Sequence, residues 1–243
     1  MHIGLSMECD HRPEVTQHQA FDEAFSTADT AEELGFDGVW LAERHFAAPW
    51  SAAASIVSAP LVLATAIAMR TSRIGVLVLP LGLNILVGLR GMTVSELVGA
   101  IRDYRASYSR AGYPGEGQVM LRVPVYVADS LERALAEPQE SAMSAYARLQ
   151  KSFTASADKA GTAGAEERAR RADSLATVTY DDLLRERLAY GTPGAVADRL
   201  VQWRNTLGLS GFIIESNVGG QISQPRVLDS IRLFAEEVAP ALR

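Results

Sequence analysis

The sequence contains a single cysteine, Cys9, among its 243 residues, which excludes an intrachain disulfide. Disulfides belong to oxidising compartments, so a chain with one cysteine favours a reducing one. The opening residues, MHIGLSMEC, also lack the basic region, apolar stretch and small-residue cleavage site of a secretory signal. We therefore expect a cytoplasmic protein.

Basic residues are fewer than acidic ones, with 23 Lys and Arg against 29 Asp and Glu, and the formal net charge is -6. Nucleic-acid-binding proteins gather Lys and Arg on one face, so this balance argues against a nucleic-acid partner. The nearly uncharged run 74–89 is shorter than the ~20 residues of a membrane helix. Pro80 and Gly82 also interrupt it. We expect no membrane partner.

Several catalytic motifs are absent, namely Walker A, G-x-S-x-G and H-E-x-x-H. Hydrolysis of esters or nucleotides therefore loses its usual sequence support. Cys9, Asp10 and His11 could form one corner of a metal site, but His2 and His18 show no ligand spacing. We expect these residues to form a polar loop and the protein to bind no metal.

Six segments have the continuous apolar character of parallel strands that are covered on both faces. Hydrophobic residues make up 48% of the chain, which is enough to bury a large core, and we expect one domain over residues 1–243. The predicted strands are residues 2–7, 38–43, 73–80, 84–88, 122–128 and 211–216.

A unit of helix, glycine and strand recurs along the chain. LGFDGVWLAE (34–43) and LGLSGFIIES (207–216) share it, with Gly35 and Gly208 where a helix should end. Thr192 and Pro193 carry the signal of a helix start. Repetition of this unit predicts an α/β fold of the TIM-type (β/α) barrel class. A doubly wound sheet is the rival, but no predicted strand is followed by G-x-G-x-x-G.

Two features do not fit a regular barrel. The predicted strands 73–80 and 84–88 are separated by only LGL, whereas a parallel crossover needs a dozen or more residues and a hairpin needs two to five. Residues 154–174 are rich in Ala, Gly and charge, without an apolar stripe wide enough for a core helix. We expect a mobile excursion there, which is either a lid over the site or a solvated loop.

In a β/α barrel the reactive groups lie at the carboxyl ends of the strands. His45 follows the predicted strand 38–43, and its ordinary pKa near neutrality suits acid–base chemistry. A histidine that hydrogen-bonds a neighbouring loop is the alternative. Glu43 and Arg44 should point to different sides because side chains alternate along a strand, so we do not expect them to pair with each other.

GFDGVWLAERHF (35–46) resembles the bacterial luciferase-like, flavin-dependent monooxygenase family, in which the second strand of a β/α barrel ends in Glu-x-His-Phe. In that family a helix, a fourth strand, a long excursion and a fifth strand separate the third strand from a sixth strand like NILVGLRG. The resemblance implies an internal deletion near residues 82–84, and an incomplete barrel with about six strands instead of eight. Further similar segments are SRIGVLVLPLG (72–82), YGTPGAVADRL (190–200) and residues 219–243.

The resemblance also implies an activity. Such a protein would use reduced flavin mononucleotide (FMN), supplied by a separate flavin reductase, and O2 to oxidise a small organic substrate. A deazaflavin-dependent hydride transferase and a shortened, catalytically silent flavin-binding protein remain the alternatives. Relatives are commonly dimeric, and the apolar segment 55–70 would suit a homodimer interface.

Site residues follow from the same resemblance. His45 and Arg44 are the implied catalytic residues: His45 matches the second of two adjacent histidines in luciferases, and Arg44 stands in place of the first. The absent segment carries much of the flavin phosphate site in relatives, and no obvious substitute for it is found in the sequence. The implied cofactor-binding residues are Glu43, Leu79, Pro80, Gly88, Glu215 and Asn217.

Overall fold

The computed structural model describes residues 1–11, 15–42, 54–55, 60–78, 85–157 and 165–243. All six predicted strands occur in one parallel sheet, which also contains a three-residue strand that the sequence pattern did not predict. A separate antiparallel pair joins β2 (Asp10–His11) and β4 (Ala54–Ser55). The strands of the main sheet are β1 (His2–Met7), β3 (Gly38–Leu41), β5 (Gly75–Val78), β6 (Ile85–Gly88), β7 (Val119–Val127), the short β8 (Ala189–Gly191) and β9 (Gly211–Glu215).

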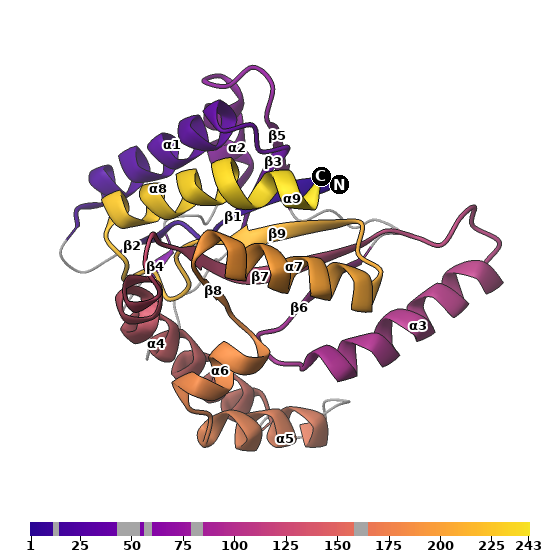
Figure 1. Cartoon of the computed structure of the whole chain (residues 1–243). Helices are drawn as coiled ribbons and strands as arrows, with labels where there is room; N and C mark the ends of the chain where they lie inside the picture. Colours follow the sequence, from indigo (N-terminus) through magenta and orange to yellow (C-terminus); the bar gives the residue numbers. More distant parts are fainter. Residues whose placement is uncertain (12–14, 43–53, 56–59, 79–84, 158–164) are drawn as a thin grey trace.

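Helices connect these strands, and Figure 1 shows α1, α7 and α8 lying along one side of the sheet. Long α3 extends away from the rest of the molecule, and α4, α5 and α6 gather beside each other. No helix of the described part is both long and apolar enough to cross a membrane. The bounds are α1 (Gln17–Glu33), α2 (Pro60–Ala68), α3 (Val94–Arg110), α4 (Leu131–Ala157), α5 (Ala165–Ala176), α6 (Tyr180–Glu186), α7 (Pro193–Leu207), α8 (Gln224–Leu233), the π-helical turn η1 (Phe234–Val238) and α9 (Ala239–Leu242).

The strand order is β5-β3-β1-β9-β7-β6, with β8 beside the end of β7. If the strands of an eight-stranded barrel are numbered along the chain, removal of the fourth and fifth leaves the order 3-2-1-8-7-6, which is the order found here. β5 and β6 are therefore the two ends of the path rather than a hairpin, although LGL and a few flanking residues join them. The parallel α/β fold is confirmed, and the sheet is not closed in the described part of the chain.

The helix–glycine–strand unit is confirmed at both predicted places. Gly35 follows α1 with φ +76° and Gly208 follows α7 with φ +62°, so each helix ends in a left-handed residue. Glycine adopts this conformation without a Cβ penalty. β3 and β9 begin three residues after these glycines, so the shared sequence frame has the same structure in both halves of the chain.

The expectation for residues 154–174 needs a correction. Where this segment is described it is helical, because α4 continues to Ala157 and α5 starts at Ala165. Ala172 and Leu175 of α5 are buried. An alanine-rich stripe is narrow, but it is sufficient here because α5 packs on the neighbouring helix α4 rather than on the wide face of a sheet (Figure 1).

The side chain of Trp40 packs closely over Gly4 in the sheet. Gly4 of β1 lies in register with Gly38 of β3 and Ile213 of β9. A Cβ on Gly4 would lie 2.5 Å from Nε1 of Trp40 and 2.9 Å from Cδ1 of Ile213. The absence of a side chain at Gly4 is therefore what makes room for the indole ring.

We predict that Gly4→Ala destabilises the protein by about 1–3 kcal/mol, because it overpacks a filled site. Gly99→Ala in α3 is the matched control, since a Cβ there meets nothing within 4 Å. It should stabilise the helix by about 0.5–1 kcal/mol. Urea unfolding at neutral pH measures both changes, and equal midpoints for the two variants would contradict the packing argument.

Candidate functional site

Five of the implied site residues, Glu43, Arg44, His45, Leu79 and Pro80, lie outside the described residues. The remaining three are described. Gly88 is the last residue of β6, Glu215 is the last residue of β9, and Asn217 lies in the loop that follows β9. Two of these belong to strands on either side of β7, so the structure brings them together at the carboxyl end of the sheet.

Strand register brings four charged side chains together at the carboxyl end of the sheet. Gly88 of β6 lies opposite Arg122 of β7, and Arg122 lies opposite Ile213 of β9. Side chains two residues apart in a strand share a face, so Glu215 follows on the face of Arg122. Arg90 follows β6 and Glu8 follows β1. Two arginines and two glutamates from four strands therefore converge.

The carboxylate of Glu215 is the centre of this cluster. Arg90 donates two hydrogen bonds to it: Nε lies 3.2 Å from Oε2, and Nη2 donates to Oε1. Arg122 Nη2 donates to the same Oε1 at 2.6 Å, and Arg122 also pairs with Glu8. The side chain of Glu215 is only 3% exposed. Two cations therefore hold one buried anion, and Glu8 balances the second of them.

Burial alone would raise the pKa of Glu215, but the charges of Arg90 and Arg122 and their hydrogen bonds lower it overall. The carboxylate is therefore ionised at neutral pH. Tyr146 of α4 is near the same charges, and burial raises its pKa so that the phenol keeps its proton. Its hydroxyl is buried and has no hydrogen-bond partner within the described ranges.

Arg122, like Tyr146, has a buried polar atom without a hydrogen-bond partner among the described residues. Its Nε has no hydrogen-bond partner in the part of the chain that the structure describes. Arg122 also lines a cavity of only about 10 Å³ with Trp40, Leu86 and Ile213.

Asn217 uses its amide inside its own loop. Its Nδ2 donates to the carbonyl of Ile222 at 3.1 Å, and its Oδ1 accepts from the N–H of Ile222 at 3.0 Å. Gly219 in this loop has φ +93°, and a Cβ there would lie 2.0 Å from the carbonyl oxygen of Ser141. Asn217 thus fixes the loop beside Glu215, and it lines a cavity of about 80 Å³ there.

The residues that the sequence reasoning missed are Glu8, Arg90, Arg122 and Tyr146. A signal for one of them was present: Arg122 is a charged residue within an otherwise apolar predicted strand. Charged residues are rarely buried unless they are paired, so such a position indicates a partner. Tyr146 carried no signal, because it lies in the middle of a long helix. Among the described residues no group of three or more His, Cys, Asp or Glu could hold a metal ion.

We predict that Glu215→Gln lowers the free energy of unfolding by about 3 kcal/mol at neutral pH, because it leaves two partly buried guanidinium groups without the carboxylate that holds both of them. Asp29→Asn is the matched control, since it makes the same change in an exposed pair with Arg70 and should shift the urea midpoint little.

The pH dependence has a defined direction. Because folding lowers the pKa of Glu215, its ionised form stabilises the protein fully above the ordinary value of 4.5, and this contribution is lost as the pH falls below that value. The difference between the parent chain and Glu215→Gln should therefore shrink between neutral pH and about pH 3. A difference that is independent of pH would contradict the assigned charge state.

Comparison with known proteins places this geometry in context. A family model described as luciferase-like monooxygenase matches residues 1–81 and 79–210. No curated protein matches the sequence.

Several solved structures have the same fold. The oxygenating constituent of 3,6-diketocamphane monooxygenase from Pseudomonas putida, in complex with FMN, has a TM-score of 0.71 at 12% identity over 99% of this chain and 98% of that chain. EDTA monooxygenase from Chelativorans sp. BNC1 has a TM-score of 0.66 at 14% identity over 100% and 93%. The coenzyme F420 dependent tetrahydromethanopterin reductase from Methanopyrus kandleri has a TM-score of 0.64 at 12% identity over 100% and 99%.

The identities to these structures are low, so the likeness establishes the fold. The family match is independent of them and covers most of the chain in both its halves. With the parallel sheet and the charged cluster at its carboxyl edge, it identifies the chain as an oxidoreductase that belongs to the luciferase-like monooxygenase family.

Proposed function

We propose that this protein is a flavin-dependent monooxygenase that binds reduced FMN and uses O2 to oxidise a small organic substrate. The observation that carries the proposal is the family match over both halves of the chain. The FMN complex of the diketocamphane monooxygenase supports the cofactor. In this proposal a separate reductase supplies the reduced flavin, and the protein works in the cytoplasm.

The described residues offer a hydrogen-bond donor to a flavin ring. The flavin, when bound, supplies the redox chemistry with O2. Nε of Arg122 would donate to a polar edge of the ring, while Trp40 and Leu86 form an apolar wall that excludes water. Glu215 would act by holding Arg122 and Arg90 in place. Gly88 leaves the backbone of β6 accessible beside Arg122, because it has no side chain.

Two groups are suited to handle protons. Tyr146 keeps its proton at neutral pH and can donate a hydrogen bond from a fixed position on α4. A histidine side chain ordinarily has a pKa near neutrality, so we propose that His45 holds or moves the proton at the reacting oxygen. Arg44 is proposed to act beside His45. We propose that Glu43, Leu79 and Pro80 line the cofactor site and that Asn217 shapes it through its loop.

The proposed deletion near residues 82–84 has two supports. The family match falls into two pieces that meet at residues 79–81. The strand order is that of a barrel without its fourth and fifth strands. The loss removes a crossover helix and with it a helix N-terminus of the kind that binds phosphate.

A deazaflavin-dependent hydride transferase is the second candidate. It is favoured by the likeness to the F420-dependent reductase, which has the same fold and nearly the same coverage as the monooxygenases. A catalytically silent flavin-binding protein is the third candidate, because the shortened sheet leaves β5 and β6 as edges.

We expect reduced FMN to bind with micromolar affinity in an anaerobic fluorescence titration, and to stabilise the chain by on the order of 2.7 kcal/mol at a hundredfold excess over Kd. Reduced F420 is titrated in parallel, and stronger binding of F420 would transfer the proposal to the second candidate. Binding of FMN without substrate oxidation on exposure to O2 would favour the silent protein. No binding of either cofactor would reject all three candidates.

The same FMN titration tests whether Nε of Arg122 donates a hydrogen bond to the flavin. Arg122→Lys keeps the charge but removes the planar Nε donor, so FMN should bind about tenfold more weakly, the loss of one hydrogen bond. Arg105→Lys makes the same change at an arginine of α3 whose Nε is also buried, but which donates to the carbonyl of Gly208 away from the cluster. Equal affinities in the two variants would remove Arg122 from the cofactor site.

We also propose that the protein is a homodimer through α2. Leu61, Val62 and Met69 of this region are 70%, 71% and 85% exposed, which is unusual for large apolar side chains. Replacing Leu61 and Val62 by Glu should halve the sedimenting mass without altering the circular dichroism spectrum. A parent chain that sediments as a monomer would contradict the proposal.

A further inference from the structure

Two charged residues, Arg187 and Glu215, are buried within the described ranges, at 6% and 3% exposed. Glu215 is the centre of the cluster at the carboxyl end of the sheet. Arg187 directly follows α6, and it lines a cavity of about 210 Å³ between the start of α3 and α5. Arginine is rarely buried in proteins, so the position of Arg187 indicates a specific role.

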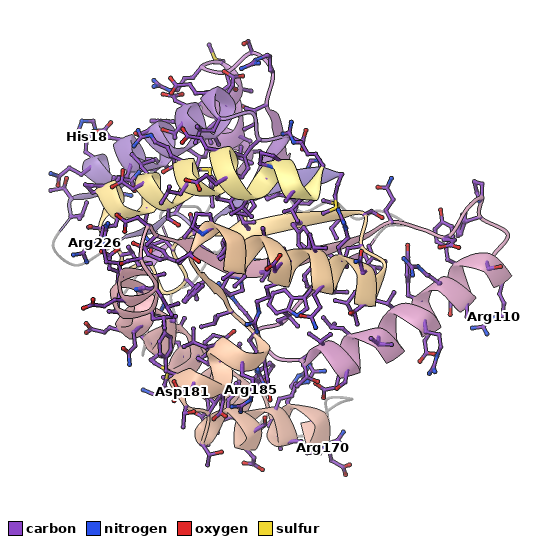
Figure 2. All side chains as sticks on the ribbon, in the orientation of Figure 1. His18, Arg110, Arg170, Asp181, Arg185 and Arg226 are labelled. Carbon is purple, nitrogen blue, oxygen red and sulfur yellow. The ribbon has the colours of Figure 1, made fainter. Side chains whose placement is uncertain are left out.

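The neighbouring Arg185 has the ordinary surroundings of a surface arginine. Figure 2 shows Arg185 on α6, where its side chain is 64% exposed and pairs with the carboxylate of Asp182. The guanidinium of Arg187 instead donates from Nη1 to the backbone carbonyl of Arg90, at 3.0 Å. An apolar side chain would fill a buried place at lower cost, so packing is a weak reason for an arginine at position 187.

The backbone of Arg187 is itself fixed. Its N–H donates to the carbonyl of Leu183 at 2.8 Å, at the end of α6. Leu183 and the buried Leu188 belong to an apolar cluster with Tyr146 and Leu175, which joins α4, α5 and α6. The side chain of Arg187 therefore extends from a packed part of the molecule to the turn that follows β6.

That turn has few other restraints. β6 ends at Gly88, and in the described part of the chain it pairs with β7 only, so strand register fixes the turn from one side. A Cβ on Gly91 would lie 3.1 Å from Cζ of Phe153, so α4 packs directly against this backbone. Arg187 adds a hydrogen bond to the preceding residue, Arg90.

Arg90 connects the two buried charges, by its carbonyl to Arg187 and by its guanidinium to Glu215. A bidentate pair such as that of Arg90 and Glu215 needs a defined geometry, and therefore a defined backbone at residue 90. The pKa of Tyr146 shows that these groups share one neighbourhood. Burial raises this pKa most, the charges of Arg90 and Arg187 lower it, and the charge of Glu215 raises it.

We propose that Arg187 is a positioning residue of the cofactor site, which holds the carbonyl of Arg90 so that the Arg90 side chain stays on Glu215. Glu215 in turn holds Arg122, whose Nε is the donor assigned to the flavin. Arg187 acts through these residues and does not itself touch the cofactor. Its effect on the flavin rests on the proposed function, whereas its effect on Glu215 does not.

FMN affinity measures the effect on the cofactor site. Arg187→Gln should weaken the binding of reduced FMN about tenfold, because glutamine is too short to reach the carbonyl of Arg90. Arg187→Lys should recover most of this loss, since its longer side chain keeps a donor and the charge. Arg199→Gln is the matched control and should leave the affinity unchanged. Arg199 also donates to a backbone carbonyl, that of Arg185, and its Nε is also buried.

The same substitution in an Arg90→Gln background separates positioning from a general loss of structure. The contact between residue 90 and Glu215 is already weakened there, so Arg187→Gln should change FMN affinity by less than about twofold. Equal losses in the two backgrounds, or no loss in the parent chain, would overturn the proposal.

Urea unfolding tests the connection without any flavin. The destabilisation caused by Glu215→Gln should fall to about half or less in the Arg187→Gln background, because Arg90 then holds the carboxylate less firmly. It should keep its full size in the Arg199→Gln background. If the parent chain binds neither FMN nor F420, the proposed function fails, while the smaller destabilisation still supports the positioning of Arg90. An equal destabilisation in the parent and Arg187→Gln backgrounds would contradict it.

Discussion

The ion pairs of the buried carboxylate of Glu215 hold together the strands at the β6 end of this sheet. It is contacted by Arg90 from the end of β6 and by Arg122 from β7, and it belongs to β9, so three strands that are distant in sequence meet at one ion. In a closed barrel, neighbouring strands on both sides would fix such residues. Here β6 is an end of the strand path, and the ion pairs add a side-chain connection across the register of β6, β7 and β9.

That cluster also reaches Arg187 through Arg90. Arg90 uses its side chain for Glu215 and its carbonyl for Arg187, while Arg187 lines the cavity between α3 and α5. Around Glu215 the charges of two arginines and two glutamates balance, and a balanced cluster suits a structural and positioning role.

Particular residues show how far sequence reasoning reaches. Gly35 and Gly208 marked the ends of α1 and α7 because only glycine adopts a positive φ at little cost. The strands that follow them were found from their continuous apolar runs. The α5 helix was not expected, because alanines give a narrow apolar stripe. Ala172 is buried only because a second helix, α4, lies against it, and this neighbour is not visible in a local pattern.

The sequence by itself determined the parallel α/β class, the six main strands and the abrupt junction between 73–80 and 84–88, because these depend on local periodicity, turn chemistry and connection length. Glu215 was also named from the sequence, through the resemblance to the family. Only the tertiary structure decided that Glu8, Arg90, Arg122 and Tyr146 surround it, and that Arg187 faces α5. Those groupings arise from strand register and helix packing, which join residues more than ninety positions apart, as Arg122 and Glu215 are.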